Sequence, residues 1–105
     1  MAVDLKEIGR IARSYAEDVK RVMPVEKAIL FGSYAQGYAT ESSDVDICFF
    51  LKDYNGKKRV EIITELLGLT GKYPGAAIEP LVFESFEMQN GNPFVREILA
   101  TGKDL

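Results

Sequence analysis

Hydrophobic side chains recur at helical spacing over residues 4–23. Most neighbours in this stripe are three or four positions apart, with charged residues between them: Leu5, Ile8, Ile11, Ala12, Tyr15, Val19 and Val22. This period predicts an amphipathic helix that packs on a core. We expect Pro24 to end it, because proline lacks the N–H that a helix interior needs.

Three short apolar runs follow, at residues 25–31, 45–51 and 77–83. Runs of this length, bounded by glycine, proline or polar residues, predict β-strands. The middle run is apolar at both odd and even positions, which predicts a central strand covered on both faces. Between the first two runs we expect a short helical turn at 33–38 and a polar loop at 40–43.

Two more helices are expected. The first follows a turn at residues 53–56, ends at Gly68 or Gly71, and is marked by these apolar positions: Val60, Ile63, Leu66 and Leu67. Asn92 followed by Pro93 predicts the start of the last helix, since asparagine caps and proline suits the first turn. Its expected buried stripe is Phe94, Ile98 and Leu99.

The resulting order is helix, strand, turn, strand, helix, strand, helix, with a loop at 86–91 and a helix stop at Gly102. A chain of 105 residues can bury one hydrophobic core and is too short for two. We therefore expect a single domain over residues 1–105. The fold class is α+β, a two-layer α/β arrangement in which helices pack on a small mixed β-sheet.

Composition narrows the function classes. Thirteen basic and sixteen acidic residues leave a net charge of −3, so no direct nucleic-acid partner is expected. The one basic run, at residues 57–59, is expected to be a solvated helix start. No apolar stretch is long enough to span a bilayer, so we expect no membrane partner. Cys48 is the single cysteine and is expected to act as a small core hydrophobe, with the cytoplasm as location.

The chain contains no histidine. The commonest general base and the commonest transition-metal ligand are therefore missing. Catalysis by this chain would have to use carboxylates, hydroxyls, amines or hard metals bound by oxygen.

Two such carboxylates enter an apolar strand in the segment FGSYAQGYATESSDVDI, residues 31–47. Asp44 and Asp46 are two positions apart, so a strand points both side chains to one face, with Cα atoms about 6.6 Å apart. Carboxylates so placed can converge on one Mg²⁺ or bridge two ions about 3.5–4 Å apart. Solvent-facing aspartates at a strand start are the simpler alternative.

Gly32 and Ser33 lie ten residues before this pair. A glycine directly after a strand allows a sharp turn and close approach of a ligand. Ser33 supplies a hydroxyl where a helix can begin, and N–H groups at such a place suit a phosphate. Phosphate binding on one side and metal-binding acids on the other describe a nucleoside triphosphate site.

Gly-Ser, ten residues and Asp-Val-Asp resemble the signature of nucleotidyltransferases of the DNA polymerase beta superfamily. The short chain is similar to the minimal nucleotidyltransferase (MNT) group, the antitoxin partners of HEPN-domain toxins. The resemblance covers the leading helix and the following segments: KAILFGS, SSDVDICFF, AIEPLVF and PFVREILATGKDL. It implies a polymerase-beta-like nucleotidyltransferase fold, with Gly32, Ser33 and the position of Gln36 binding the nucleotide.

The family also uses a third carboxylate on a later strand, and the resemblance assigns this role to Glu79. Glu79 would be a metal ligand or the base for the attacking hydroxyl. Many family members have aspartate here, and the following Pro80 favours an edge strand. An acid merely exposed at that edge is the alternative. Glu84 has the wrong parity for this site and ranks below Glu79.

The turn departs from the family pattern, since Gln36 stands where relatives often have arginine. Glutamine offers neutral hydrogen bonds and no charge to a phosphate. A slower enzyme, or one that takes the charge from its partner, is implied. Tyr34 and Tyr38 could stack on a base, although packing on the sheet is favoured for at least one of them.

The resemblance implies Mg²⁺-dependent transfer of AMP from ATP to a hydroxyl, with a tyrosine of a HEPN toxin as acceptor. Three alternatives stay open. The chain could neutralise its toxin by binding alone, could modify a small molecule such as an aminoglycoside, or could be a non-catalytic scaffold.

Overall fold

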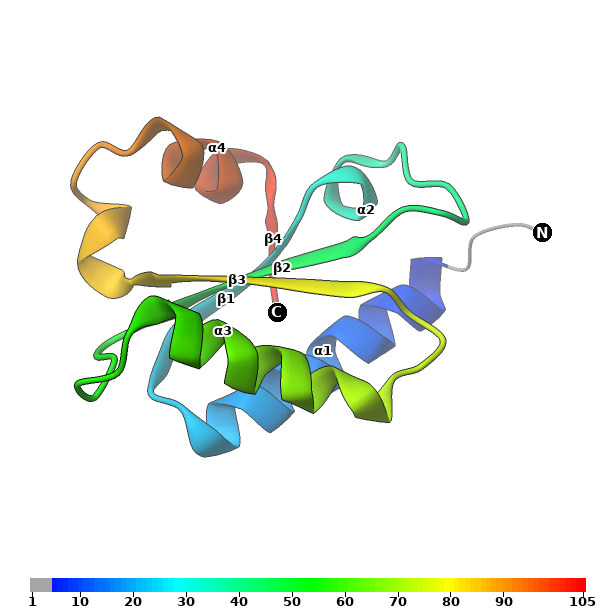
Figure 1. Ribbon diagram of the computed structural model, residues 1–105. Helices are drawn as coiled ribbons and strands as arrows, with labels where there is room; N and C mark the ends of the chain where they lie inside the picture. The colour runs from blue at the N-terminus through cyan, green and yellow to red at the C-terminus, as the bar shows by residue number, and fades with distance from the viewer. Residues whose placement is uncertain (1–4) are drawn as a thin grey trace.

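The computed structural model describes residues 5–105. The elements in chain order are α1 (Leu5–Val22), β1 (Val25–Phe31), α2 (Ser33–Gln36), β2 (Val45–Leu51), α3 (Arg59–Gly68), η1 (Leu69–Lys72), β3 (Ile78–Glu84), η2 (Ser85–Met88), α4 (Pro93–Thr101) and β4 (Lys103–Asp104) (Figure 1). The expected first helical residue, Asp4, lies outside the described residues. Within 5–105, no helix combines the length and the apolar character needed to cross a membrane.

The strands form one mixed sheet in the order β3-β2-β1-β4. The central strand β2 is antiparallel to β1 and parallel to β3, as the expected mixed sheet requires. The edge position favoured by Pro80 is confirmed, because β3 is hydrogen-bonded to β2 alone.

The two-residue strand β4 was not expected. It pairs antiparallel with β1, with Ile29 opposite Asp104 and Leu30 opposite Lys103. α4 ends at Thr101, so Gly102 is the expected helix stop. A Cβ on Gly102 would collide with the Ile29 side chain, so glycine lets the chain cross closely over β1.

Both faces of β2 are covered, as its apolar pattern predicted. One face packs with α1 and α3 and contributes Val45, Ile47, Phe49 and Leu51 to the larger core cluster. The other face contributes Cys48 and Phe50 to a smaller cluster with Val95 and Ile98 of α4. Figure 1 shows α1 and α3 on one side of the sheet and α4 on the other. Cys48 is fully buried, and burial raises the pKa of its thiol to about 12, so it is the expected core residue.

Some residues of the expected apolar stripes are exposed. The exposed fractions are 58% for Leu5, 64% for Val22, 67% for Val60, 50% for Leu67 and 50% for Phe94. Leu5 and Val22 are the first and last residues of α1. α3 buries Ile62 and Leu66, and α4 buries Val95 and Ile98. These helices turn a slightly different face inward than expected.

Two shorter segments also differ from the expectation. A 3₁₀ turn, η2, occupies part of the expected 86–91 loop, and β3 begins and ends one residue later than expected.

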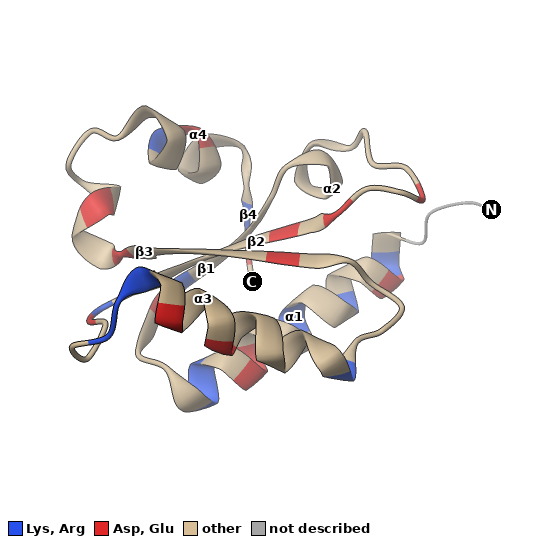
Figure 2. Ribbon diagram, in the orientation of Figure 1, with Lys and Arg blue, Asp and Glu red and all other residues tan. Residues whose placement is uncertain are grey.

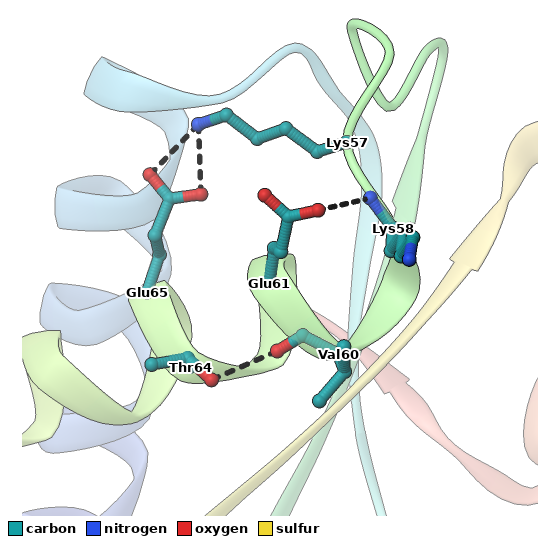
Figure 3. Close-up of polar contacts among 6 residues, drawn as sticks. All are labelled: Lys57, Lys58, Val60, Glu61, Thr64 and Glu65. Atoms are coloured by element: carbon teal, nitrogen blue, oxygen red, sulfur yellow. Dashed lines mark hydrogen bonds and ion pairs between the residues drawn. The ribbon is translucent and has the colours of Figure 1, made fainter.

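The basic run at 57–59 leads into α3, where Figure 2 shows it as a blue segment. The backbone N–H of Lys58 donates to Glu61 Oε1 at 3.0 Å, which caps the first turn. Lys57 Nζ lies 2.9 Å from Glu65 Oε2, and Thr64 Oγ1 donates to the Val60 carbonyl at 2.8 Å (Figure 3). Lys57 and Lys58 thus form the expected solvated helix start, whereas Arg59 donates from Nε to the Val82 carbonyl at 2.9 Å and lies over the Phe83 ring.

Tyr15 ties α1 to α3. It is fully buried, and its hydroxyl donates to the Leu66 carbonyl at 2.6 Å. Burial raises the pKa of Tyr15, so the hydroxyl remains a donor.

We expect Tyr15→Phe to lower the free energy of unfolding by about 1 kcal/mol and the melting temperature by about 4–8 °C. Thermal unfolding followed by circular dichroism measures this. The control Tyr38→Phe, at a residue that is 64% exposed, should melt like the parent; equal melting of all three proteins would contradict the role of the bond.

Candidate active site

The predicted site residues lie at one end of the sheet. β1 ends where β2 and β3 begin, because β1 runs antiparallel and β3 parallel to β2. Asp46 therefore has two direct cross-strand partners, Phe31 on β1 and Glu79 on β3. Gly32 and Ser33 follow Phe31 at the same end. Figure 2 shows the acidic segments at the starts of β2 and β3 side by side.

Asp46 and Glu79 point toward the face covered by α4, whereas Asp44 lies just before β2 begins and so outside the strand in which it was expected. Side chains two positions apart along a strand share a face. Asp46 therefore shares its face with the buried residues Cys48 and Phe50, and Glu79 shares its face with Leu81 and Phe83. α4 covers the far part of this face. The end that carries the carboxylates is more open, since Asp44 and Glu79 are exposed and Asp46 is partly buried.

The carboxyl group of Asp46 has a raised pKa. Partial burial raises its pKa above the usual aspartate value, and the negative charges of Asp44 and then Glu79 raise it further. Each of these effects disfavours the ionised form. A cation or a positively charged ligand group placed among the three carboxylates would offset the repulsion.

The fit to a metal ion is partial. Within residues 5–105, no three Asp, Glu or Cys side chains are close enough to hold a metal ion as they stand. The donor chemistry nevertheless suits Mg²⁺, which prefers carboxylate oxygens and keeps several waters and phosphate oxygens. The backbone register makes Asp46 and Glu79 direct neighbours, and side-chain torsions decide whether their oxygens converge. An exposed edge acid and a metal ligand are both compatible with the position of Glu79.

Position 32 requires glycine for two reasons: the backbone conformation there and the lack of space for a side chain. Its φ of 74° lies in the region that favours glycine, and its ψ is −151°. A Cβ at this position would collide with Asp46 Oδ2 and lie 3.2 Å from Asp46 Cγ. The absence of a side chain at Gly32 therefore leaves the space that the Asp46 carboxylate occupies. This contact links the Gly-Ser turn directly to the acidic pair.

Ser33 begins α2, the expected helical turn, which ends at Gln36 rather than at Tyr38. The N–H of Gly37 donates to the Ser33 carbonyl at 2.9 Å and closes the turn. The first N–H groups of a helical turn have no partners within it, so they suit an anion. Gln36 is exposed. Tyr34 is buried and packs in the core, as favoured for one of the two tyrosines, whereas Tyr38 is exposed.

Phe31 was not singled out from the sequence. It lies on the face of Asp46, next to the acids, and is only partly buried. Its position directly before Gly32 is the signal that could have identified it.

A second group of charges has a structural role. Asp18 accepts a hydrogen bond from the Tyr73 hydroxyl at 2.6 Å and lies 3.3 Å from Lys72 Nζ and 3.1 Å from Arg21 Nη1. The Tyr73 bond is the main cause that lowers the pKa of Asp18. These residues line a groove of about 550 Å³, and their contacts hold η1 against α1.

The raised pKa of Asp46 has a consequence for stability. The folded protein holds the ionised Asp46 carboxylate less favourably than the unfolded chain does. This cost to stability is absent below about pH 4, where the carboxyl is protonated in both states, and it grows as the pH rises through the raised pKa. We expect Asp46→Asn to stabilise the ligand-free protein at pH 7 by roughly 1 kcal/mol, or about 4–8 °C, and to lose this advantage below about pH 4. Urea unfolding across pH measures it, with Glu97→Gln on α4 as a control for charge removal. A destabilised Asp46→Asn protein at pH 7 would indicate a structural role for the carboxylate.

Comparison with known proteins gives a consistent result. A protein-family model described as "Polymerase beta, Nucleotidyltransferase" matches residues 13–105. Two proteins of Methanocaldococcus jannaschii, both named "Putative protein adenylyltransferase", are similar to this chain. One is 32% identical over 93 residues, which cover 89% of this chain and 88% of the relative. The other is 36% identical over 81 residues, which cover 77% of this chain and 78% of the relative.

Solved structures share the fold. A crystal structure described as a "putative nucleotidyltransferase" from Sulfolobus solfataricus has a TM-score of 0.70 at 17% identity, over 95% of this chain and 80% of that chain. A mutant of the toxin-antitoxin MntA-HpeT has a TM-score of 0.57 at 19% identity, over 98% and 72% of the two chains. A toxin-antitoxin with AMP-PNP has a TM-score of 0.53 at 18% identity, over 97% and 72%. From the family model that matches residues 13–105, its relatives and its fold, this chain belongs to the polymerase beta nucleotidyltransferase family.

Proposed function

We propose that this chain transfers AMP from ATP to a tyrosine hydroxyl of a HEPN-domain toxin and so acts as an antitoxin. The observation that carries the proposal is the register that places Asp46 beside Glu79 and next to the Gly32 turn. The names of the Methanocaldococcus jannaschii relatives and the toxin-antitoxin structures with the same fold support it.

Asp44 and Asp46 would hold Mg²⁺, with Glu79 as a further ligand. The metal would supply positive charge that neutralises phosphate oxygens in the transition state. Ser33 and the N–H groups at the start of α2 would hold the triphosphate tail. Gln36 would add neutral hydrogen bonds. Phosphoryl-type transfer asks mainly for such positioning and charge stabilisation, and this chain supplies both without histidine.

The reaction forms one bond and breaks one. The acceptor oxygen bonds to the α-phosphorus of ATP, and the bond from that phosphorus to the oxygen bridging the β-phosphorus breaks. Pyrophosphate leaves, and AMP remains on the acceptor. The proton of the hydroxyl passes to the Glu79 carboxylate, or to solvent if Glu79 serves only as a metal ligand.

Labelled ATP tests the proposal directly. The chain is mixed with Mg²⁺, a HEPN toxin partner and ATP labelled at the α-phosphate or, in a parallel reaction, at the γ-phosphate. The α-label should appear on the toxin, the γ-label should not, and chelation of Mg²⁺ by EDTA should stop the transfer. Transfer of the γ-label would indicate a kinase, and no transfer of either label would overturn the proposed reaction.

One observation favours a second function, neutralisation of the toxin by binding alone. No three described carboxylates of residues 5–105 converge on a metal position as they stand. A variant with both Asp44→Asn and Asp46→Asn separates the two functions. An antitoxin that acts by transfer should lose its protection of growing cells in this variant, whereas one that acts by binding should keep it.

A further inference from the structure

A half-exposed aromatic ring lies over the sheet face that also carries Asp46, in contact with Phe31 and Phe83. Phe94 lies in the first turn of α4 and is 50% exposed. Its ring centroid is 6.3 Å from that of Phe31 and 6.3 Å from that of Phe83, with interplanar angles of 85° and 65°. Asn92 Oδ1 accepts the Phe94 N–H at 3.0 Å and holds the start of the helix. Two edge contacts and a cap therefore orient this ring, although half of it remains open.

Phe31 connects this ring to the carboxylates. It is the antiparallel partner of Asp46, so the two side chains share a face and their Cα atoms are about 5 Å apart. Further along this face, Cys48 and Phe50 are fully buried under α4. Phe31 and Leu81 are only partly buried, so an apolar surface emerges from under α4 beside the acids.

Asp46 has Glu79 on one side, on β3, and Phe31 on the other side, on β1. Glu79 lies on β3, the edge strand, where a macromolecular acceptor can approach. Phe31 lies on the opposite side, on β1, and leads directly into the Gly32–Ser33 turn. A nucleotide whose phosphates lie at the Gly32–Ser33 turn would have its base near Phe31 and Phe94, and an acceptor would reach the acids from the side of the edge strand.

We propose that Phe94, supported edge-on by Phe31, is the platform on which the nucleobase of the substrate stacks. This inference rests on the proposed function, because it takes the phosphates to lie between Ser33 and Asp46. Stacking on an aromatic ring contributes to the affinity for every base, since each base has a π-face. Phe94 thus supplies affinity for a nucleoside triphosphate over inorganic tripolyphosphate and does little to select one base.

Isothermal titration with the full chain and Mg²⁺ tests the platform, with ATP and tripolyphosphate as two separate ligands. Phe94→Leu keeps apolar volume against Phe31 and Phe83 and removes the π-face. We expect it to raise the Kd for ATP at least about fivefold and to leave the Kd for tripolyphosphate unchanged. The matched control is Phe86→Leu, at a phenylalanine of η2 that is 60% exposed, and it should change neither Kd. Melting curves check that both variants are folded.

Each other outcome has a definite meaning. An unchanged Kd for ATP in folded Phe94→Leu overturns the platform, and so does equal weakening of ATP and tripolyphosphate. If Phe94→Leu leaves the Kd for ATP unchanged but raises the KM for the acceptor, the ring serves the acceptor and the inference is wrong. A parent protein that binds neither ligand overturns the proposed function itself, together with the platform. A parent that binds both, with no effect of Phe94→Leu, leaves the proposed function standing.

Discussion

Asp46→Asn is expected to lower the rate of AMP transfer by about three orders of magnitude. Asparagine keeps the size of the side chain but removes the negative charge that would hold the cation against the phosphates. A metal contributes several kcal/mol of charge stabilisation to such a transition state, and about 4 kcal/mol corresponds to a thousandfold change in rate. The initial rate at which α-label reaches the toxin, with saturating ATP, measures the effect.

The control for this experiment is Glu84→Gln. Glu84 lies on the same strand as Glu79, but at the other end, where it pairs with Leu51. Its loss should change the rate by no more than about twofold. If Asp46→Asn transfers label as fast as the parent, the carboxylate has no catalytic role, whatever its effect on stability.

The Asp46→Asn experiments together separate catalysis from folding. A stabilised and inactive variant is the pattern expected where a protein accepts repulsion among charges for the sake of its reaction. A destabilised and inactive variant would instead mean that activity is lost with the fold.

Gly32→Ala is expected to damage both the fold and the reaction. The backbone at position 32 has a positive φ, which alanine tolerates poorly, and the added Cβ collides with the Asp46 carboxylate. We expect the free energy of unfolding to fall by about 1–3 kcal/mol. A displacement of Asp46 by about 1 Å would also lower transfer about a hundredfold. Urea unfolding and the labelling assay measure the two effects.

Gly56→Ala is the matched control. Gly56 has a φ of 78°, close to that of Gly32, but nothing lies within 4 Å of an added Cβ. It should therefore lose stability through backbone strain alone and keep its transfer rate. Equal stability losses in the two variants, with activity kept in both, would show that the contact between Gly32 and Asp46 is unimportant.

The pattern along the chain predicted the two inner strands to the residue. Pro24 and Gly32 bound residues 25–31, and the charged residues Asp44 and Lys52 bound residues 45–51, so local signals mark the ends of both strands. The continuous apolar character of residues 45–51 also predicted correctly that helices cover both faces of β2, because each face must find its own core.

The helix faces were less predictable. Val60, Leu67 and Phe94 have the right period for a buried stripe, yet they are exposed. A stripe defines a face of a helix only to within about one position, and the neighbour that packs on it decides which residues are buried. The short pairing of β4 with β1 likewise depends on the close crossing of the chain at Gly102, which no local sequence pattern predicts.

The amino-acid sequence alone determined the chemical inventory of the site: two aspartates two positions apart where a strand begins, a Gly-Ser turn before them, and no histidine. These are local properties, set by residue type and by the two-residue period of a strand. The tertiary structure alone decided that Glu79 is the direct neighbour of Asp46, that the Gly32 backbone makes room for the Asp46 carboxylate, and that Phe94 packs on Phe31, the cross-strand partner of Asp46. Register and helix docking bring together residues that are far apart in the chain, and they depend on how the whole core packs.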